Sequence, residues 1–283
     1  MNKVRNTLLA SGKHVPVTKL CKWLGQTHSS AYYQPRQRRE RPIDEAMAAR
    51  IKRIHREEPA CGVRGTWSRL RFVEGVKVNQ KKVHRIMKLK GWTLPKRRTG
   101  RRPRVKGSSS IAEQPNQRWA TDLAMIHCGR DGWCVFVPVI DCCTREVLGH
   151  ALELAGKAKT AERALEEALL NRFGTLRSAP MGMKLRHDNG LVFGSRQYRA
   201  VVNDDGLTQE YITPYTPQQN GLCERFIKTF KEEFAWTRNF QSIEHARFAL
   251  RAWIQHYNQR RPHQALKYKS PTQYHQTRCN TAA

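Results

Sequence analysis

Three acidic residues at separated points of the chain have the types and surroundings that metal-dependent phosphoryl transfer requires. Asp122 lies in an apolar, strand-like run, Asp188 follows a short strand, and Glu224 begins a helix, with 35 residues between the last two. Converging carboxylates repel each other unless cations neutralise them, and magnesium prefers such hard oxygen ligands. Two such ions roughly 4 Å apart can activate the attacking oxygen and stabilise the leaving one at phosphorus. A single acidic residue of this kind more often has a structural role, in a turn, at a helix cap or on the solvated surface, than a catalytic one.

The helix that begins near Glu224 is expected to carry two lysines beside the carboxylate. At about 100° per residue, Lys228 and Lys231 fall within about 40° of Glu224 around the helix axis. An apolar arc elsewhere on the helix, with Phe226 and Phe230, would face the core. A carboxylate next to two cations suits a metal ligand beside side chains that contact phosphate.

The elements that must position these residues have the pattern of a mixed α/β sheet. Strand-like runs lie at 118–126, 133–141 and 145–154, before a helix at 160–173 and shorter strands at 183–187 and 207–213. Three strands, then helix, strand, helix, strand and helix is the order of a ribonuclease-H-like sheet flanked by helices. Asp122 would lie inside the first strand and Asp188 at the end of the fourth, where sites on open sheets gather. Asn220 and Gly221 are expected in a loop that is mobile until DNA binds.

The charge balance points to a polyanionic partner. The 283 residues include 52 Lys and Arg against 23 Asp and Glu, a formal net charge of +29. Residues 1–110 hold 29 basic and 6 acidic side chains, which leaves +23 there and +6 in the rest. A basic half of this kind is typical of nucleic-acid binding, although a ribosomal or histone-like protein would share it. The sequence shows no signal peptide or apolar run long enough to span a membrane, so a cytoplasmic protein with free thiols is expected.

The basic half predicts two small helical units of the helix-turn-helix kind. In segment 1–36, Val17, Leu20, Cys21 and Leu24 form a helical stripe that Gly25 ends. In segment 44–95, Asn79 would cap a third helix, whose basic residues are available for a phosphate backbone. They are Lys81, Lys82, Arg85 and Lys88. A plain helical hairpin and a solvated basic face remain the alternative interpretations.

A basic linker at 96–114 is expected to separate these units from the domain at 115–275. Seven of the eleven residues from 96 to 106 are basic, and Gly107 with three serines follows. The arginines expected to follow DNA phosphates are Arg97, Arg98, Arg101, Arg102 and Arg104. A nuclear-localisation signal would look similar. The cysteines and histidines lack paired zinc spacing.

The combined motifs resemble the D,D(35)E core of integrases and transposases. The trio Asp122, Asp188 and Glu224 is accompanied by Lys231 and by the flanking text QRWATD at 117–122. The tail YNQRRPHQALKYKSP at 257–271 is similar to the end of insertion-sequence transposases of the IS-three type. The text HDNG at 187–190 resembles an IS-two-like subgroup. The resemblance covers almost the whole chain, including the helical unit at 44–95.

This resemblance implies a polynucleotidyl transferase with an integrase catalytic core. Two Mg²⁺ or Mn²⁺ ions would be held by the three acids, with Lys231 as a fourth catalytic residue and Lys228 as a further DNA contact. The reaction would nick the ends of a bacterial insertion sequence and join the freed 3′ hydroxyl to target DNA. Double-stranded DNA, further copies of the chain and an upstream-frame protein are the implied partners, because the chain resembles the second frame of a frameshift fusion.

Two other functions are compatible with parts of this pattern. One is a nuclease of the same fold that only hydrolyses DNA. The other is a helix-turn-helix regulator built on a core without activity. The presence of all three acids favours the transposase over the regulator.

Overall fold

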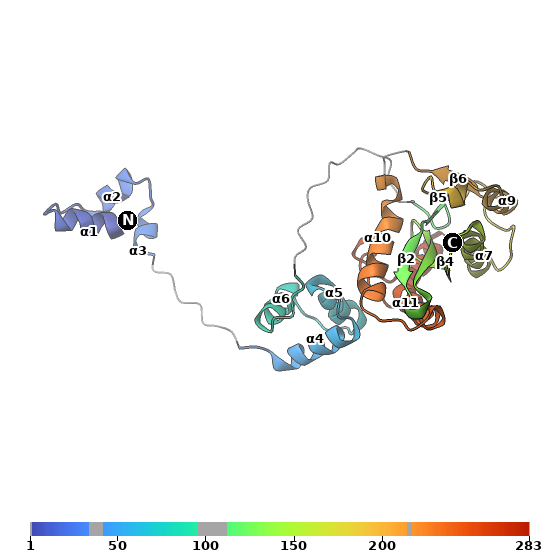
Figure 1. Cartoon of the computed structure of the whole chain (residues 1–283). Coiled ribbons are helices and arrows are strands. Elements are labelled where there is room, and N and C mark those ends of the chain that lie inside the picture. Colours follow the sequence, from blue (N-terminus) through green and yellow to red (C-terminus); the bar gives the residue numbers. More distant parts are fainter. Residues whose placement is uncertain (1, 34–41, 96–111, 214–216, 283) are drawn as a thin grey trace. The chain divides into compact units, whose positions relative to one another are not determined.

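The computed structural model describes residues 2–33, 42–95, 112–213 and 217–282 (Figure 1). The chain forms two compact units, Met1–Ile43 and Asp44–Ala283. The predicted linker arginines between 97 and 104 lie outside the described residues. No helix in the described part of the chain is long and apolar enough to cross a membrane.

The first unit contains three short helices, α1 (Asn2–Ala10), α2 (Val17–Trp23) and α3 (His28–Tyr32). Leu20 and Cys21 of the predicted stripe are buried, whereas Leu24 is 44% exposed. Gly25 has a φ of +61°, which a glycine adopts without steric cost and which allows the turn between α2 and α3. The sequence pattern did not predict α1.

The second unit begins with a helical module around a small core. Its helices are α4 (Glu45–Glu57), α5 (Val63–Ser68), the π-helical turn η1 (Arg69–Val73) and α6 (Gln80–Leu89). The Asn79 side chain accepts a hydrogen bond from the Lys81 amide at 2.8 Å, which confirms the predicted cap. Val83 and Ile86 are fully buried, so α6 packs through the predicted face.

A six-stranded mixed sheet forms the centre of the second unit. Its strands are β1 (Arg118–Thr121), β2 (Ala124–His127), β3 (Trp133–Asp141), β4 (Val147–Glu153), β5 (Lys184–His187) and β6 (Thr208–Tyr211). β3 pairs antiparallel with β1, β2 and β4, whereas β1, β5 and β6 pair in parallel. The predicted strand at 118–126 is therefore two strands, and Asp122 lies in the break between them because Asp122 and Leu123 leave the pairing with β3. The mixed α/β class with flanking helices is confirmed.

Helices cover both faces of the sheet because β3 alternates its buried side chains between two cores. Val137 and Val139 pack with α7 (Ala158–Phe173), α8 (Leu191–Gly194) and α9 (Arg196–Asp204). Phe136 and Ile140 pack with α10 (Gly221–Phe230), η4 (Lys231–Ala235) and α11 (Ile243–Gln259). Gly149 lets α7 approach closely, since a Cβ there would lie 2.3 Å from the Ala164 carbonyl oxygen. Figure 1 shows α7 and α10 on opposite sides of the strands.

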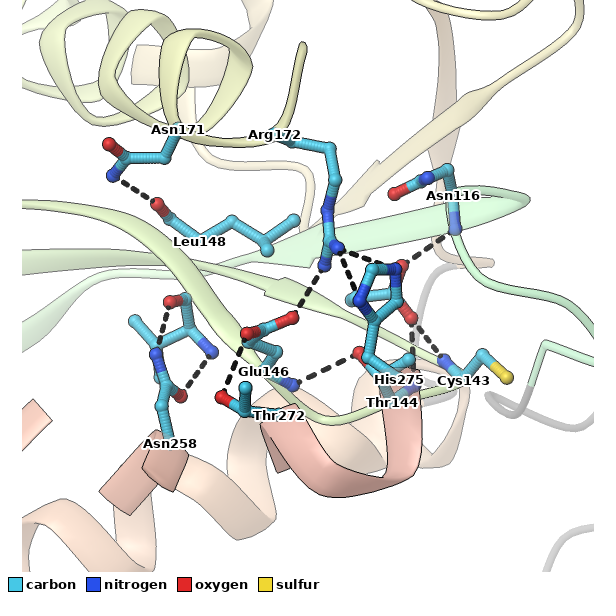
Figure 2. Close-up of polar contacts among 12 residues, drawn as sticks. Asn116, Cys143, Thr144, Glu146, Leu148, Asn171, Arg172, Asn258, Thr272 and His275 are labelled. Carbon is cyan, nitrogen blue, oxygen red and sulfur yellow. Dashed lines mark hydrogen bonds and ion pairs between the residues drawn. The ribbon is translucent and has the colours of Figure 1, made fainter. Parts of the chain in front are cut away.

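The C-terminal helix α12 (Pro271–Ala282), which follows the short turn η5 (Gln264–Leu266), is joined to the β3–β4 hairpin by a polar cluster. Arg172 of α7 pairs with Glu146 at 2.7 Å, and Thr272 donates to the same carboxylate at 3.1 Å (Figure 2). Arg172 also donates to the His275 ring. Asn258 exchanges two hydrogen bonds with the Val147 backbone at 3.0 and 2.8 Å. These contacts hold the hairpin turn from two sides.

Candidate active site

Two neighbouring parallel strands bring Asp122 and Asp188 to the same edge of the sheet. β1 and β5 pair in parallel, with Ala120 opposite Arg186. Asp122 follows the last residue of β1, and Asp188 follows the last residue of β5. Because parallel strands end at one edge, the two carboxylates lie at adjacent strand ends.

The start of α10 is tied to the same edge by the residue before it. The Asn220 side chain is 3% exposed, and its Nδ2 donates to the Thr121 carbonyl oxygen at 3.4 Å. Glu224 follows near the start of α10 with an exposed side chain. The expected loop at Asn220 and Gly221 was wrong: 217–220 is a short 3-10 helix and Gly221 begins α10. The buried amide of Asn220 fixes the backbone there.

The three carboxylates influence one another electrostatically. Burial is the main cause that raises the pKa of Asp122 from its ordinary 3.8 to about 6. The negative charges of Asp188 and Glu224 raise this pKa further. The Leu123 amide, which donates to Asp122 Oδ1 at 2.8 Å, and the charge of Lys231 act in the opposite direction. The edge therefore concentrates negative charge in a partly buried place.

The three acids are not arranged as a preformed metal-binding site. Among the described residues, which include all three, no group of three His, Cys, Asp or Glu side chains is placed to hold a metal ion. Their donor chemistry still fits a hard divalent cation, because they offer only oxygen atoms and positive charge would relieve the repulsion that raises the pKa of Asp122. The Gly190 amide donates to Asp188 Oδ1 at 3.0 Å, and a Cβ on Gly190 would lie 2.9 Å from that oxygen.

A buried arginine connects the sheet to the segment before α10. Arg186 is 3% exposed, and its Nη1 donates to the Gln219 carbonyl oxygen at 2.6 Å. Its Nε donates to Glu210 at 2.9 Å, and Arg118 donates to the same carboxylate at 2.7 and 3.2 Å. Burial would raise the pKa of Glu210, but the two arginines together outweigh burial and lower it. This network spans β1, β5 and β6 and fixes the segment that leads to Glu224.

The Gln219 side chain connects the segment before α10 to Thr213, which follows β6. Its Oε1 accepts from the Thr213 amide at 2.7 Å, and its Nε2 donates to the Thr213 hydroxyl at 3.1 Å. On the β5 side, His187 is buried and donates to the Asp188 carbonyl oxygen at 2.7 Å. Its other ring nitrogen faces Gln209 Nε2 at 3.2 Å, which makes the neutral ring an acceptor. These bonds fix the backbone beside two of the acids.

The two predicted lysines differ in their surroundings. Lys231 is half-buried at the start of η4, and its charge lowers the pKa of Asp122. Lys228 is exposed and lies 4.0 Å from Glu232, one helical turn further along. Lys231 is therefore a lysine whose charge reaches Asp122.

The basic residues predicted on α6 face solvent to different extents. Lys81, Lys82 and Lys88 are exposed, whereas Arg85 is half-buried. Lys82 forms an ion pair with Asp44 at 2.6 Å. This face is separate from the three acids, so its role in DNA binding stays a prediction.

Sequence reasoning missed the residues that position the acids. Arg186 and Gln219 form their bonds over 33 residues of chain, and Asn220 reaches Thr121 over 99. The one available signal was an arginine next to His187 in a strand that otherwise faces the core, where a charge is rarely buried without a partner.

Three family models match this chain. Integrase core domain models match residues 112–217 and 205–271, and an HTH-like domain model matches residues 42–100. Transposase InsD for insertion element IS2A/D/F/H/I/K of Escherichia coli is 30% identical over 257 residues, which cover 86% of this chain and 83% of the relative. Transposase InsD for insertion element IS2-9 of Escherichia coli K12 is equally similar, with 81% of its length covered.

Two of the solved structures that match this chain contain an intasome and an integrase domain. A chain of the simian T-cell lymphotropic virus intasome, solved with PP2A regulatory subunit B56 gamma, matches with a TM-score of 0.49 and 16% identity over 80% of this chain and 74% of that chain. The catalytic core domain of BIV integrase matches with a TM-score of 0.44 and 18% identity over 59% of this chain and 98% of that domain.

Proposed function

This chain belongs to the insertion-element transposases that carry an integrase core domain, and we propose that Asp122, Asp188 and Glu224 carry out its catalysis. A transposase of this family is a polynucleotidyl transferase that acts on DNA. The observation that carries the assignment is geometric: adjacent parallel strand ends present the two aspartates, and the buried Asn220 ties the start of the Glu224 helix to the same edge.

The three acids would hold two divalent cations, Mg²⁺ or Mn²⁺, through carboxylate oxygens. When bound, the ions would neutralise the carboxylate charge and assist both the attacking and the leaving oxygen of the displacement. The backbone amides of Leu123 and Gly190 each donate to one aspartate oxygen, so the other oxygen of each group would be available to a cation. Lys231, whose charge reaches Asp122, would contact the phosphate being attacked.

Two displacements at phosphorus account for transposition. Water first attacks the phosphodiester at the end of the element, and the bond to the 3′ oxygen breaks to release a 3′ hydroxyl. That hydroxyl then attacks a phosphodiester of the target, a P–O bond forms to the element, and a target 3′ hydroxyl leaves. In each displacement the phosphoryl group is transferred from a DNA oxygen either to water or to another DNA oxygen. The protein therefore needs to supply no nucleophile.

The partners follow from this reaction. Joining two ends of one element requires more than one active site, so we propose that copies of the chain assemble on paired ends. We also propose that a protein from the upstream frame, separate or fused, takes part. The module at 44–95 and the linker at 96–114 would bind DNA, and the domain at 115–275 would carry out catalysis.

Substitution of each acid tests the assignment. Asp122→Asn, Asp188→Asn and Glu224→Gln should each reduce metal-dependent joining of an element-end duplex by on the order of 10³-fold or more, because each removes a charged ligand. DNA affinity should be unchanged. Glu244→Gln, at an exposed acid in the first turn of α11, is the matched control and should join like the wild type.

Wild-type joining by any of the three variants would refute the role of that acid. Cleavage without joining by the wild type under every metal condition would instead support a hydrolytic nuclease.

A further inference from the structure

A cavity of about 880 Å³ lies along the side of the helix that carries Glu224. Its walls are α5, the β3–β4 hairpin turn, α10 and the segment that follows α11. We call it the α10 flank cavity. Four arginines line it, Arg64, Arg145, Arg225 and Arg261, and Asp141 is the one acid among the described residues that line it.

Two of these four arginines are already paired. Arg261 forms a two-bond pair with Glu233, at 2.6 and 2.8 Å. Arg64 donates to the Gln264 side chain at 2.7 Å. Asp141 is fully buried and accepts from the Cys143 and Thr144 amides at 2.8 Å each, and from the Asn116 amide at 2.7 Å. The acid in the wall is therefore occupied by backbone donors.

Arg145 and Arg225 are left without an acid. In the described part of the chain, neither guanidinium forms an ion pair or a hydrogen bond with a carboxylate. The Arg145 pKa is lowered, mainly by burial, and the positive charge of Arg225 lowers it further. Two cations thus face one cavity and repel each other, which an anion between them would relieve.

The hairpin turn holds Arg145 in a fixed conformation. Its φ is +62°, in the left-handed region, and its amide donates to the Asp141 carbonyl oxygen at 2.8 Å. The next residue, Glu146, is held by Arg172 and Thr272 (Figure 2). Because the turn is fixed at both ends, the backbone of Arg145 needs no further ordering when its side chain binds an anion.

The cavity borders the catalytic face of α10. At about 100° per residue from Glu224, the lining residues of α10 fall on an arc from about 60° to about 200°. They are Gly221, Arg225, Thr229, Leu222 and Phe226. Glu224 itself lies about 60° outside this arc, so a polyanion bound in the cavity would run along the side of α10 next to the one that carries the carboxylate.

We propose that the α10 flank cavity binds the phosphate backbone of the substrate DNA next to the phosphodiester that reacts, through Arg145 and Arg225. A guanidinium pairs with phosphate through two parallel N–H groups, and such contacts carry no sequence preference. The proposal rests on the proposed function, because the three acids place the reacting phosphodiester, whereas DNA binding in the cavity itself needs no metal. It adds two arginine contacts to those predicted for Lys228, Lys231 and the basic N-terminal half.

Metal-free DNA binding by the full chain tests the proposal. The double variant Arg145→Gln/Arg225→Gln is compared with Arg199→Gln, an exposed arginine of α9, all in an Asp188→Asn background with chelator. A random-sequence duplex serves as the probe, since backbone contacts are read without sequence. Loss of two phosphate contacts should reduce the slope of log affinity against log salt by about 1.8 and lower affinity roughly 10- to 100-fold near 0.1 M salt.

The charge-preserving variant separates charge from packing. Arg145→Lys/Arg225→Lys should keep most of the salt slope, because each lysine keeps its phosphate contact. Thermal unfolding controls for folding, and if Arg145→Gln unfolds the chain, Arg225→Gln alone should reduce the slope by about 0.9. A slope and affinity that change no more than in Arg199→Gln would overturn the proposal, whatever the acid variants do in joining assays.

Discussion

At the scale of single residues, the partly buried carboxylate of Asp122 lowers the stability of the folded chain when it is ionised. Its pKa is raised from 3.8 to about 6 by burial, with Asp188 and Glu224 adding to the rise. A carboxylate whose pKa is higher in the folded chain disfavours folding once it is ionised. The cost is absent below pH 4, grows between pH 4 and pH 6, and is complete above pH 6.

Removal of this charge should stabilise the metal-free chain. Asp122→Asn is expected to raise the free energy of unfolding at pH 7.5 with chelator by about 1–3 kcal/mol, since one pKa unit corresponds to about 1.4 kcal/mol. The gain should shrink as pH falls from 6 to 4, where the native carboxyl is itself neutral. Urea unfolding at pH 7.5 and pH 4 measures both values, and a stability loss at pH 7.5 would contradict this account of the site.

The sequence allowed the acids and Lys231 to be predicted, because their types and spacing are local features that follow the element pattern. It did not allow a role for Arg145 to be predicted, because that role depends on a left-handed turn and on the like charge of Arg225, which lies 80 residues further along the chain. The lack of a neighbouring acid, which distinguishes it from Arg261, is visible only in three dimensions.

At the scale of elements, the site depends on how the segment before α10 is fixed. The predicted strands and helices at 133–141, 160–173 and 183–187 are confirmed, because their apolar periodicity is strong. The break at Asp122 was not predicted, since apolar residues continue on both sides of it. The attachment of 217–220 to the sheet depends on long-range bonds by Arg186 and Asn220, which no local pattern encodes.

Loss of the bond from Arg186 to Gln219 should therefore loosen the Glu224 helix. Arg186→Met is expected to lower the joining rate about 10-fold or more and to raise the Mg²⁺ concentration needed for half-maximal rate, because Glu224 is less well placed as a ligand. Arg118→Met is the matched control, since Arg118 pairs with the same Glu210 but makes no bond to Gln219. Joining rates measured against Mg²⁺ should separate the two variants, and equal Mg²⁺ dependence would contradict a positioning role.

At the scale of the whole molecule, binding and chemistry use opposite charges. Residues 1–110 hold +23 of the net +29, and the remaining 173 residues hold +6. A domain close to balance can group three carboxylates at one sheet edge and still present unpaired arginines beside them. DNA would then be held by cations along the chain, and the phosphodiester would react only where the acids hold metal.

A change of metal preference tests this division most directly. Asp188→Cys in the full chain replaces a hard oxygen ligand by a soft thiolate, which disfavours Mg²⁺ more than Mn²⁺. The ratio of Mn²⁺- to Mg²⁺-supported joining should rise at least about 10-fold over the wild type, while duplex affinity in chelator stays unchanged. An unchanged ratio, with Mg²⁺-supported joining at the wild-type rate, would contradict the claim that these carboxylates hold the catalytic metal.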